Sequence, residues 1–452
     1  MIDYMLMFAV IAGIALLLFL ILRIKLNAFL ALLMASITVG LLAGMSFTDI
    51  TDTITEGMGN TLGFVAVVVG LGSIFGAILD HSGGARNLAL FMLGRFGEKK
   101  ASAAMLVSGF LIAIPVFFDV AFIILVPILS ALSKRTGKHI MVFALPLLTG
   151  IGITHSFIPP TPGPVAVADI LKADLGWVIF LGLIVAIPTA MLCGLVISPM
   201  VTRRYKDQKI STEQLNELEA AIDGNIVRNT LLLIGLPIVL ILTGTLVKTL
   251  VDLGNISQNL LIDSVIFLGH PFTALILATL SAMYFMGTRY GVTREKLFEL
   301  SNNSLAPAGA IILITGGGGV FKQTLIETGA GQMVAEALAG TNMYIIVLAY
   351  IISALMRVIQ GSATVAMITA AGIVAPLIIF SPVSNAENAL LVLAIAAGSV
   401  FMSHVNDSGF WLVNRYLDIS VPETLRTWSV LSSLISLIGF LIIMIIFLFI
   451  GG

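Results

Sequence analysis

Apolar runs of about twenty residues recur along almost the whole chain, and each is long enough to cross the hydrocarbon core of a bilayer as a helix. Only 10% of the residues are charged and 58% are hydrophobic, whereas a soluble domain carries about 25% charged residues. The sequence therefore predicts an all-α polytopic membrane protein and excludes a soluble enzyme. Predicted spans lie near 4–22, 26–44, 62–80, 140–170, 177–198, 229–250, 264–286, 304–327, 386–417 and 428–449.

Two further apolar stretches, 101–133 and 343–380, are too long for one membrane helix and too short for two complete ones. Basic residues flank the first stretch on both sides, for example Lys99 before it and Lys134 after it. Because Lys and Arg collect in cytoplasmic loops, this stretch should enter and leave on the cytoplasmic side as a re-entrant hairpin. The flanks of 343–380 are not basic, so the second hairpin should enter and leave on the outside.

The longest polar segment, 201–228, divides the chain into an N-terminal repeat, 1–200, and a C-terminal repeat, 229–452. Its Lys and Arg residues predict a cytoplasmic linker. The first apolar run is long enough to span and has no basic residue before it, which favours a retained helix over a signal peptide. Counting spans from the linker then places both termini outside the cell (inner) membrane.

The two halves share short motifs in the same order. Gly70–Phe75 resembles Gly316–Phe321, and His155 in the first half corresponds approximately to His404 in the second, at an offset of about 246 residues. The two hairpins fall in the same register. Each half holds five spans and one hairpin, and an odd number of spans inverts the second copy in the membrane. The sequence therefore predicts two inverted repeats, as transporters often have.

Two predicted spans, 140–170 and 386–417, contain residues that break helices. Phe157–Pro164 holds four prolines, and Asn406–Gly409 is a set of turn-forming residues. Irregular backbone is tolerated at membrane depth only where protein or a water-filled cavity satisfies it. Paired broken helices beside paired hairpin tips predict a binding site at the membrane midplane, where half-helix N-termini face an anion.

Polar residues inside a membrane are costly, so those near the two breaks and the two hairpin tips are the candidates for the site. The predicted substrate-binding residues are Asp119, His155, Thr161, Gly163, Arg357, Gln360, Ser362, Thr364, His404, Asn406, Asp407 and Ser408.

These candidates divide by chemistry. Arg357 suits a carboxylate, because a guanidinium offers two parallel hydrogen bonds. Asp119, Asp407 and His404 are candidates for carrying a coupling proton. Hydroxyl and amide side chains suit the hydroxyl groups of a substrate, and these are Gln360, Ser362, Thr364, Asn406 and Ser408.

Each of these assignments has a structural alternative. Arg357 could instead form an internal salt bridge with Asp407 or Asp119. Asp119 could cap a helix at the hairpin tip, and His155 and His404 could be hydrogen-bonded structural histidines.

Cofactor motifs are incomplete. The glycines of Gly70–Gly76 are not spaced as in a dinucleotide fingerprint, and Gly316–Gly319 followed by Lys322 does not match a P-loop. The five histidines are dispersed, which argues against a metal site. The net charge of −1 provides no basic surface for nucleic acid. We therefore expect no cofactor, no metal and no nucleic-acid partner.

Five motifs along the chain resemble those of the gluconate permease family of proton symporters, within the larger ion transporter superfamily. They are Phe118–Phe122, Pro159–Ala166, Gly316–Gly319, Gln360–Ala366 and His404–Trp411. The resemblance implies uptake of sugar acids such as gluconate with protons. It also implies a homodimer in which a hairpin-bearing part moves against a scaffold like an elevator.

One position departs from this resemblance, since Thr161 stands where many relatives are expected to have His. That leaves other small carboxylates open as substrates, such as D-serine or glycerate. A cation/proton antiporter of the same architecture is a further alternative, although hydroxyl and amide groups beside Arg357 favour an organic anion. An intramembrane enzyme is disfavoured because the catalytic motifs are missing.

Overall fold

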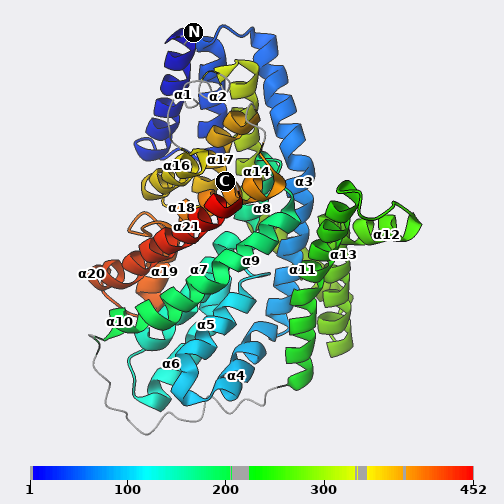
Figure 1. Ribbon diagram of the computed structural model, residues 1–452. Coiled ribbons are helices and arrows are strands. Elements are labelled where there is room, and N and C mark those ends of the chain that lie inside the picture. Colours follow the sequence, from blue (N-terminus) through cyan, green and yellow to red (C-terminus); the bar gives the residue numbers. More distant parts are fainter. Residues whose placement is uncertain are drawn as a thin grey trace.

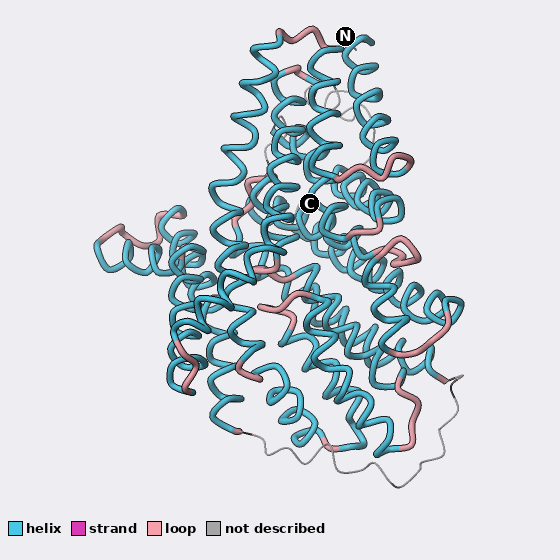
Figure 2. The backbone as a smooth tube through the Cα atoms, turned by 180° about the vertical axis from the view of Figure 1, so that it is seen from behind, coloured by secondary structure: helices cyan, strands magenta, loops and turns pink. Residues whose placement is uncertain are grey.

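A computed structural model describes residues 4–203, 205, 223–330, 333, 344–379 and 383–450. Every regular element among these residues is helical, and eight of their helices are long and apolar enough to cross a membrane (Figure 1). The prediction of an all-α polytopic membrane protein is therefore confirmed. Figure 2 shows the reverse side, with short loop segments lying among the helices at mid-height.

The first half begins with two helices that pack on each other and continues through one long helix and several shorter ones. Its elements are α1 (Tyr4–Leu22), α2 (Ala28–Leu42), α3 (Phe47–His81), α4 (Gly84–Phe96), α5 (Ala101–Ile112), α6 (Phe118–Thr136), α7 (Met141–Phe157), α8 (Pro162–Ile170), α9 (Leu175–Met191), a π-helical turn (Leu192–Ile197) and α10 (Ser198–Thr202).

The second half repeats the order of long helix, helix pair, broken helix and long helix. Its elements are α11 (Gly224–Asp252), α12 (Leu260–Gly269), α13 (Pro271–Ala282), α14 (Arg294–Glu327), α16 (Ile345–Gln360), α17 (Ala363–Ile379), α18 (Asn385–Val400), α19 (Ser408–Tyr416), α20 (Val421–Thr424) and α21 (Val430–Ile450).

The long helices α3 and α14 lie along each other and join the two halves. Glycine permits this close approach, because small residues let helix backbones meet. A Cβ atom on Gly57 would lie 2.7 Å from Val320 Cα, and one on Gly319 would lie 2.7 Å from Gly57 O. The other glycines of the Gly316–Gly319 turn face different neighbours: Gly317 contacts α2, and Gly318 contacts α17.

The helix pair α5–α6 returns to the end of the molecule from which it starts. Glu98, just before α5, pairs with Arg135 at the end of α6, with Nε and Oε1 2.5 Å apart. Figure 1 shows α5 and α6 at the lower end of the molecule and α16 and α17 nearer the upper end. The two pairs thus approach from opposite ends, an arrangement expected of inverted repeats.

Two predicted spans start later in the sequence prediction than in the structure. α3 begins at Phe47 rather than near 62, and α14 begins at Arg294 rather than near 304. The reason is local capping, which overrides the polar composition of these segments. Ser46 Oγ accepts the Asp49 N–H at 3.1 Å, and Thr293 caps α14 in the same way.

The predicted span 264–286 is wrong as a single helix. Pro271 lacks an N–H and suits only the first position of a helix, so α13 starts there with His270 as its cap. α12 becomes a separate short helix that projects sideways from the molecule (Figure 1). The polar linker was predicted to end at 228, but α11 already starts at Gly224. Residues 206–222 of the predicted linker lie outside the described part of the chain.

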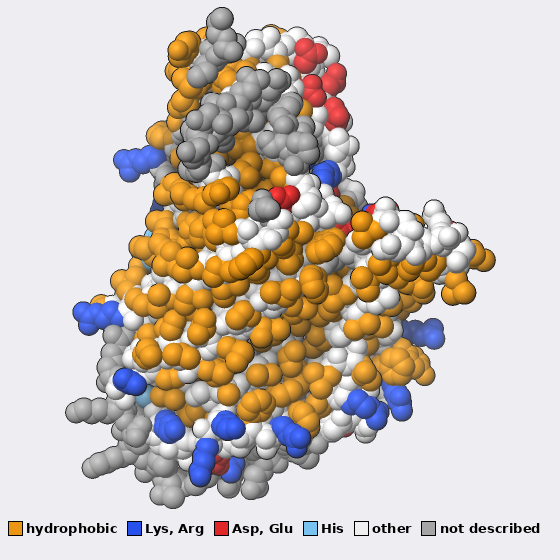
Figure 3. Space-filling view, viewed as in Figure 1, with side chains coloured by type: hydrophobic (Ala, Val, Ile, Leu, Met, Phe, Trp, Pro, Cys, Tyr) orange, Lys and Arg blue, Asp and Glu red, His pale blue; other side chains and the backbone are white. Residues whose placement is uncertain are grey.

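Charge is distributed unevenly along the long axis. Lys and Arg side chains gather at the lower end of the molecule in Figure 3, acidic side chains cluster at the upper end, and hydrophobic side chains cover the broad band between them. The acidic residues Asp49, Asp52 and Glu56 lie on the part of α3 nearest the upper end. A bilayer would therefore enclose the middle band.

Candidate functional site

The polar candidates lie where the helices are interrupted. α5 and α6 are separated at 113–117, α7 and α8 at 158–161, α16 and α17 at 361–362, and α18 and α19 at 401–407. Gly361 has a φ of +77° and packs so closely on the last interruption that a Cβ would lie 2.7 Å from Asn406 Cγ. Glycine is therefore required at this hairpin tip.

Arg357 and Asp407 form a buried ion pair at the second hairpin and the second break. Arg357 Nη2 donates to Asp407 Oδ2, and Arg357 Nη1 donates to the carbonyl of Gly361. Their side chains are only 6% and 10% exposed. The internal salt bridge to Asp407, an alternative left open by the sequence, is present. Arg357 Nε is buried with no hydrogen-bond partner in the described structure, so its N–H remains free to donate.

A second set of polar groups holds Asp407 in place. Ser403 Oγ donates to Asp407 Oδ2, and Trp428 Nε1 donates to Ser403 Oγ at 2.8 Å. The backbone N–H of Gly409 donates to Asp407 Oδ1 at 3.1 Å, so Asp407 also caps α19. Ser403 and Trp428 escaped the sequence prediction because these hydrogen bonds form only in the folded chain.

The side chains of His404 and Asn406 form hydrogen bonds with backbone carbonyls of α16. His404 Nε2 donates to the carbonyl of Val358 at 3.0 Å, and Asn406 Nδ2 donates to the same carbonyl at 2.9 Å. The last carbonyls of a helix lack backbone partners, so these two side chains satisfy the end of α16. In this conformation His404 is therefore a hydrogen-bonded structural histidine, which is the alternative that the sequence left open.

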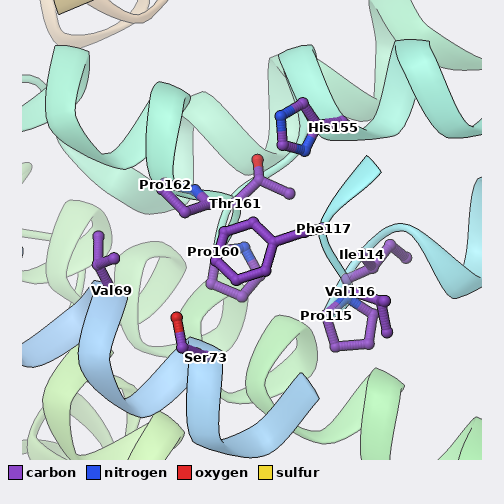
Figure 4. Close-up of a pocket in the computed structure, with 11 residues that line it drawn as sticks. Val69, Ser73, Ile114, Pro115, Val116, Phe117, His155, Pro160, Thr161 and Pro162 are labelled. Carbon is purple, nitrogen blue, oxygen red and sulfur yellow. The ribbon is translucent and has the colours of Figure 1, made fainter. Parts of the chain in front are cut away.

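A cavity lies at the first break, between α3, the loop that joins α5 to α6 and the α7–α8 interruption (Figure 4). His155 and Thr161, both predicted, line it, together with Ser73 from α3. Ser73 Oγ and His155 Nδ1 are buried without hydrogen-bond partners in the described structure. Unsatisfied buried polar groups are uncommon and call for a ligand or a water. Ser73 belongs to the repeated motif Gly70–Phe75, which was the available signal for it.

Phe118 connects this cavity with the ion pair. Its ring lies 6.3 Å from the His155 ring and 5.8 Å from the Trp428 ring, between centroids. A Cβ on Gly409 would lie 3.3 Å from Phe118 Cε1. The first turns of α6 and α19 therefore meet, and the Phe118 ring lies close to residues of both halves.

Asp119 occupies the first turn of α6 and is exposed. That Asp119 binds substrate or carries the coupling proton stays a prediction. Asp119 still lies within electrostatic range of Asp407. No side chain caps α6 at Phe117, so the first N–H groups of α6 remain available to an anion.

The other N-termini offer fewer donors than expected. Pro162 and Pro164 provide no N–H at the start of α8, and Gly163 packs against Met367, where a Cβ would lie 2.8 Å from the sulfur. Ser362 Oγ accepts the N–H of Val365 at 3.4 Å and so caps α17.

Three remaining candidates differ in burial. Gln360 is half-buried and its Oε1 is buried without a partner, whereas Thr364 is half-buried and Ser408 is exposed. Gln360 is thus a better placed acceptor than Ser408. Among the described residues, no group of three or more His, Cys, Asp or Glu side chains could hold a metal ion.

Comparison with known sequences gives matches over nearly the whole chain. The sequence profile described as "GntP family permease" matches residues 5–449. The "Low-affinity gluconate transporter" of Escherichia coli is 38% identical over 440 residues, covering 97% of both chains. The "Gluconate permease" of Pseudomonas aeruginosa is 37% identical over 430 residues, covering 94% of both. The "Gnt-II system L-idonate transporter" of Escherichia coli is 34% identical over 442 residues, covering 95% of this chain and 96% of that one.

A solved structure shares the fold. The crystal structure of the YdaH transporter of Alcanivorax borkumensis superimposes with a TM-score of 0.63 over 90% of each chain, at 13% sequence identity. At that identity the likeness concerns the arrangement of helices alone.

Proposed function

Because the chain belongs to the GntP family of permeases, we propose that it imports gluconate or a related small hydroxylated carboxylate together with protons. The chain is a multi-pass membrane transporter and not an enzyme, since its relatives are transporters and permeases throughout. The proposed substrate rests on the names of several relatives, which are called gluconate transporters or permeases. These relatives are 36–38% identical to this chain over almost its full length.

The Arg357–Asp407 pair suggests how a proton and a carboxylate would be coupled. In the present conformation the guanidinium is held by Asp407 and by the Gly361 carbonyl. Neutralising Asp407 with a proton removes the charge that holds Arg357. The guanidinium then accepts the carboxylate of a substrate, because a buried cation requires an anionic partner. One proton and one monovalent carboxylate would enter together, and no net charge would cross the membrane.

The hydroxyl groups of the substrate would face the cavity at the first break. Ser73, His155 and Thr161 line that cavity, and the first two have unused hydrogen-bonding atoms. Gln360 Oε1 adds an acceptor near Arg357. The site thus offers one cation and several hydrogen-bond donors and acceptors. A small molecule with one carboxylate and several hydroxyl groups would suit this arrangement.

Uptake by purified protein in liposomes tests this proposal. An inward proton gradient should drive accumulation of labelled gluconate above its external concentration, and collapse of the gradient with an ionophore should abolish it. A sodium gradient alone should not drive uptake. Accumulation of L-idonate, D-serine or glycerate in place of gluconate would contradict the proposed substrate but would support proton symport. Cation efflux in exchange for protons without any carboxylate would contradict the proposal in favour of an antiporter.

The proposed orientation places the linker and the lower end of the molecule in the cytoplasm and both termini outside. Its support is the gathering of Lys and Arg at that end (Figure 3) together with the preference of these residues for cytoplasmic loops. The pairing of Glu98 with Arg135 supports a re-entrant hairpin whose two ends lie on the same side.

We expect single cysteines at Lys99 and Lys138, the two ends of the first hairpin, to react with an impermeant maleimide only from the cytoplasmic side. Both positions are exposed, and the native Cys193 is buried and is first replaced by serine. A cysteine at Asp52, near the opposite end, is the matched control and should react only from outside. Labelling of Lys99 and Lys138 from opposite sides would contradict the hairpin.

We also propose that the protein works as a homodimer with an elevator-type motion of the hairpin-bearing part against a scaffold. The support is the resemblance to the ion transporter superfamily. Cross-linking in native membranes should give a product of twice the monomer mass.

A further inference from the structure

The outer end of α8 is held by two side chains from the other half of the molecule. The last carbonyls of a helix have no backbone partners. Lys322 Nζ, from α14, donates to the carbonyl of Ile170 at 2.6 Å. Asn388 Nδ2, from α18, donates to the carbonyl of Leu171 at 3.0 Å. A cation at this position also suits the negative end of the helix dipole.

The bond from Lys322 is directed at backbone and not at a carboxylate. Within the described ranges, no carboxylate oxygen lies within ion-pair distance of Lys322. The nearby Asp169 is buried and pairs with Lys172 instead, at 3.1 Å between Nζ and Oδ1. Lys322 is half-buried and follows the Gly316–Gly319 turn, whose glycines hold α14 tightly against α2, α3 and α17. The ammonium group is therefore mounted on a well-fixed helix.

The other end of α8 contributes to the cavity. Thr161, just before the helix, and Pro162, its first residue, both line the cavity (Figure 4). α8 has nine residues and is therefore only about 14 Å long. A short helix fixed at one end carries a displacement of that end to the other without bending.

We propose that Lys322 is a positioning residue for substrate binding: by holding the Ile170 carbonyl, it fixes α8 and so places Thr161 in the cavity. The proposal rests on the proposed function for its substrate, but the placement of Thr161 can be measured without one. Lys322 lies about 150 positions from Ile170 in the sequence, and the failed P-loop comparison gave no indication of this role.

The test compares Lys322→Met with Lys322→Arg. The methionine removes the donor at similar length, whereas the arginine keeps a cationic donor. The first readout is the alkylation rate of a single cysteine at Thr161 in a Cys193→Ser background. The second is the Kd for gluconate of the purified protein with Thr161 intact. We expect Lys322→Met to change the alkylation rate and to raise Kd about tenfold, and Lys322→Arg to restore both.

Two further variants separate positioning from a loss of charge or of folding. Lys172→Met removes a cation beside the same Asp169 but leaves the bond to α8, and should alter neither readout. Thr161→Ala should raise Kd in the wild-type background and add little to Lys322→Met, because both act through the same contact. If Lys322→Met does not reach the membrane, Lys322→Gln serves instead, since its amide is too short to reach Ile170.

The outcomes are distinct. Unchanged alkylation and unchanged Kd in Lys322→Met overturn the positioning role, as does full additivity with Thr161→Ala. A wild-type protein that does not bind gluconate contradicts the proposed function, and the alkylation rates then decide the role of Lys322 on their own.

Discussion

Asp407→Asn is expected to abolish proton-driven accumulation of the substrate and to leave substrate exchange across the membrane intact. Asparagine resembles a protonated aspartate in shape, keeps the oxygen that accepts the Gly409 N–H and removes the charge that holds Arg357. The guanidinium is then permanently free for a carboxylate, and no proton is needed to release it.

The same variant should change the pH dependence of binding. In the wild-type protein the substrate competes with the Asp407 carboxylate for Arg357, and a proton on that carboxylate removes the competitor, so affinity should fall as the pH rises. In Asp407→Asn the competitor is absent, so the affinity should not depend on the pH. Counterflow of labelled substrate and equilibrium binding at several pH values measure the two effects.

Asp119→Asn is the matched comparison for this prediction. Asp119 lies in electrostatic range of Asp407 but is exposed and has no part in the ion pair. It should keep most of its uphill transport. If Asp119→Asn alone loses accumulation, the proton is carried by Asp119, and if both variants still accumulate substrate, neither carboxylate couples transport.

Arg357→Lys is expected to weaken substrate binding by about 30- to 100-fold while the protein still inserts and folds. Lysine preserves the positive charge next to Asp407 but lacks the planar fork that reaches the Gly361 carbonyl and a carboxylate together. Hydrogen bonds to charged groups contribute about 1.5–3 kcal/mol each, and about 1.4 kcal/mol corresponds to a factor of ten. Titration of the detergent-solubilised protein with gluconate measures the loss.

Removal of the cation needs a different design. Arg357→Ala should abolish binding, but it also leaves Asp407 buried without its partner, which costs about 3–5 kcal/mol. The double variant Arg357→Met/Asp407→Asn removes both charges and should restore folding without restoring binding. Recovery of normal affinity in the double variant would show that Arg357 serves only as a structural partner of Asp407.

The sequence predicted the broad architecture because hydrophobic length and proline position act locally. The closely spaced prolines Pro159 and Pro162 disfavour a continuous helix, and the structure separates α7 from α8 at that place. Span boundaries failed where a single capping residue decided them, as Ser46 does for α3 and His270 for α13. Such caps are visible in the sequence but compete with average polarity.

The site was harder to predict because its contacts join distant segments. Arg357 and Asp407 were both singled out, and one of the pairings considered is present, but Ser403 and Trp428 gain their roles only through folding. Ser73 reaches the cavity because α3 passes beside the α7–α8 break. Exposure of Asp119 likewise depends on neighbours that no local pattern reveals.

The four successive glycines Gly316–Gly319 form one turn of α14 that is packed against neighbouring helices on several sides. An ordinary helix packs one side against its neighbours and leaves the others free to vary over evolution. Around Gly316–Gly319, α3 approaches the first and last glycine, α2 approaches Gly317 and α17 approaches Gly318, so each position in the turn faces a packed neighbour. The run thus records mutual crowding among helices, and its likeness to a phosphate-binding loop has a steric and not a chemical origin.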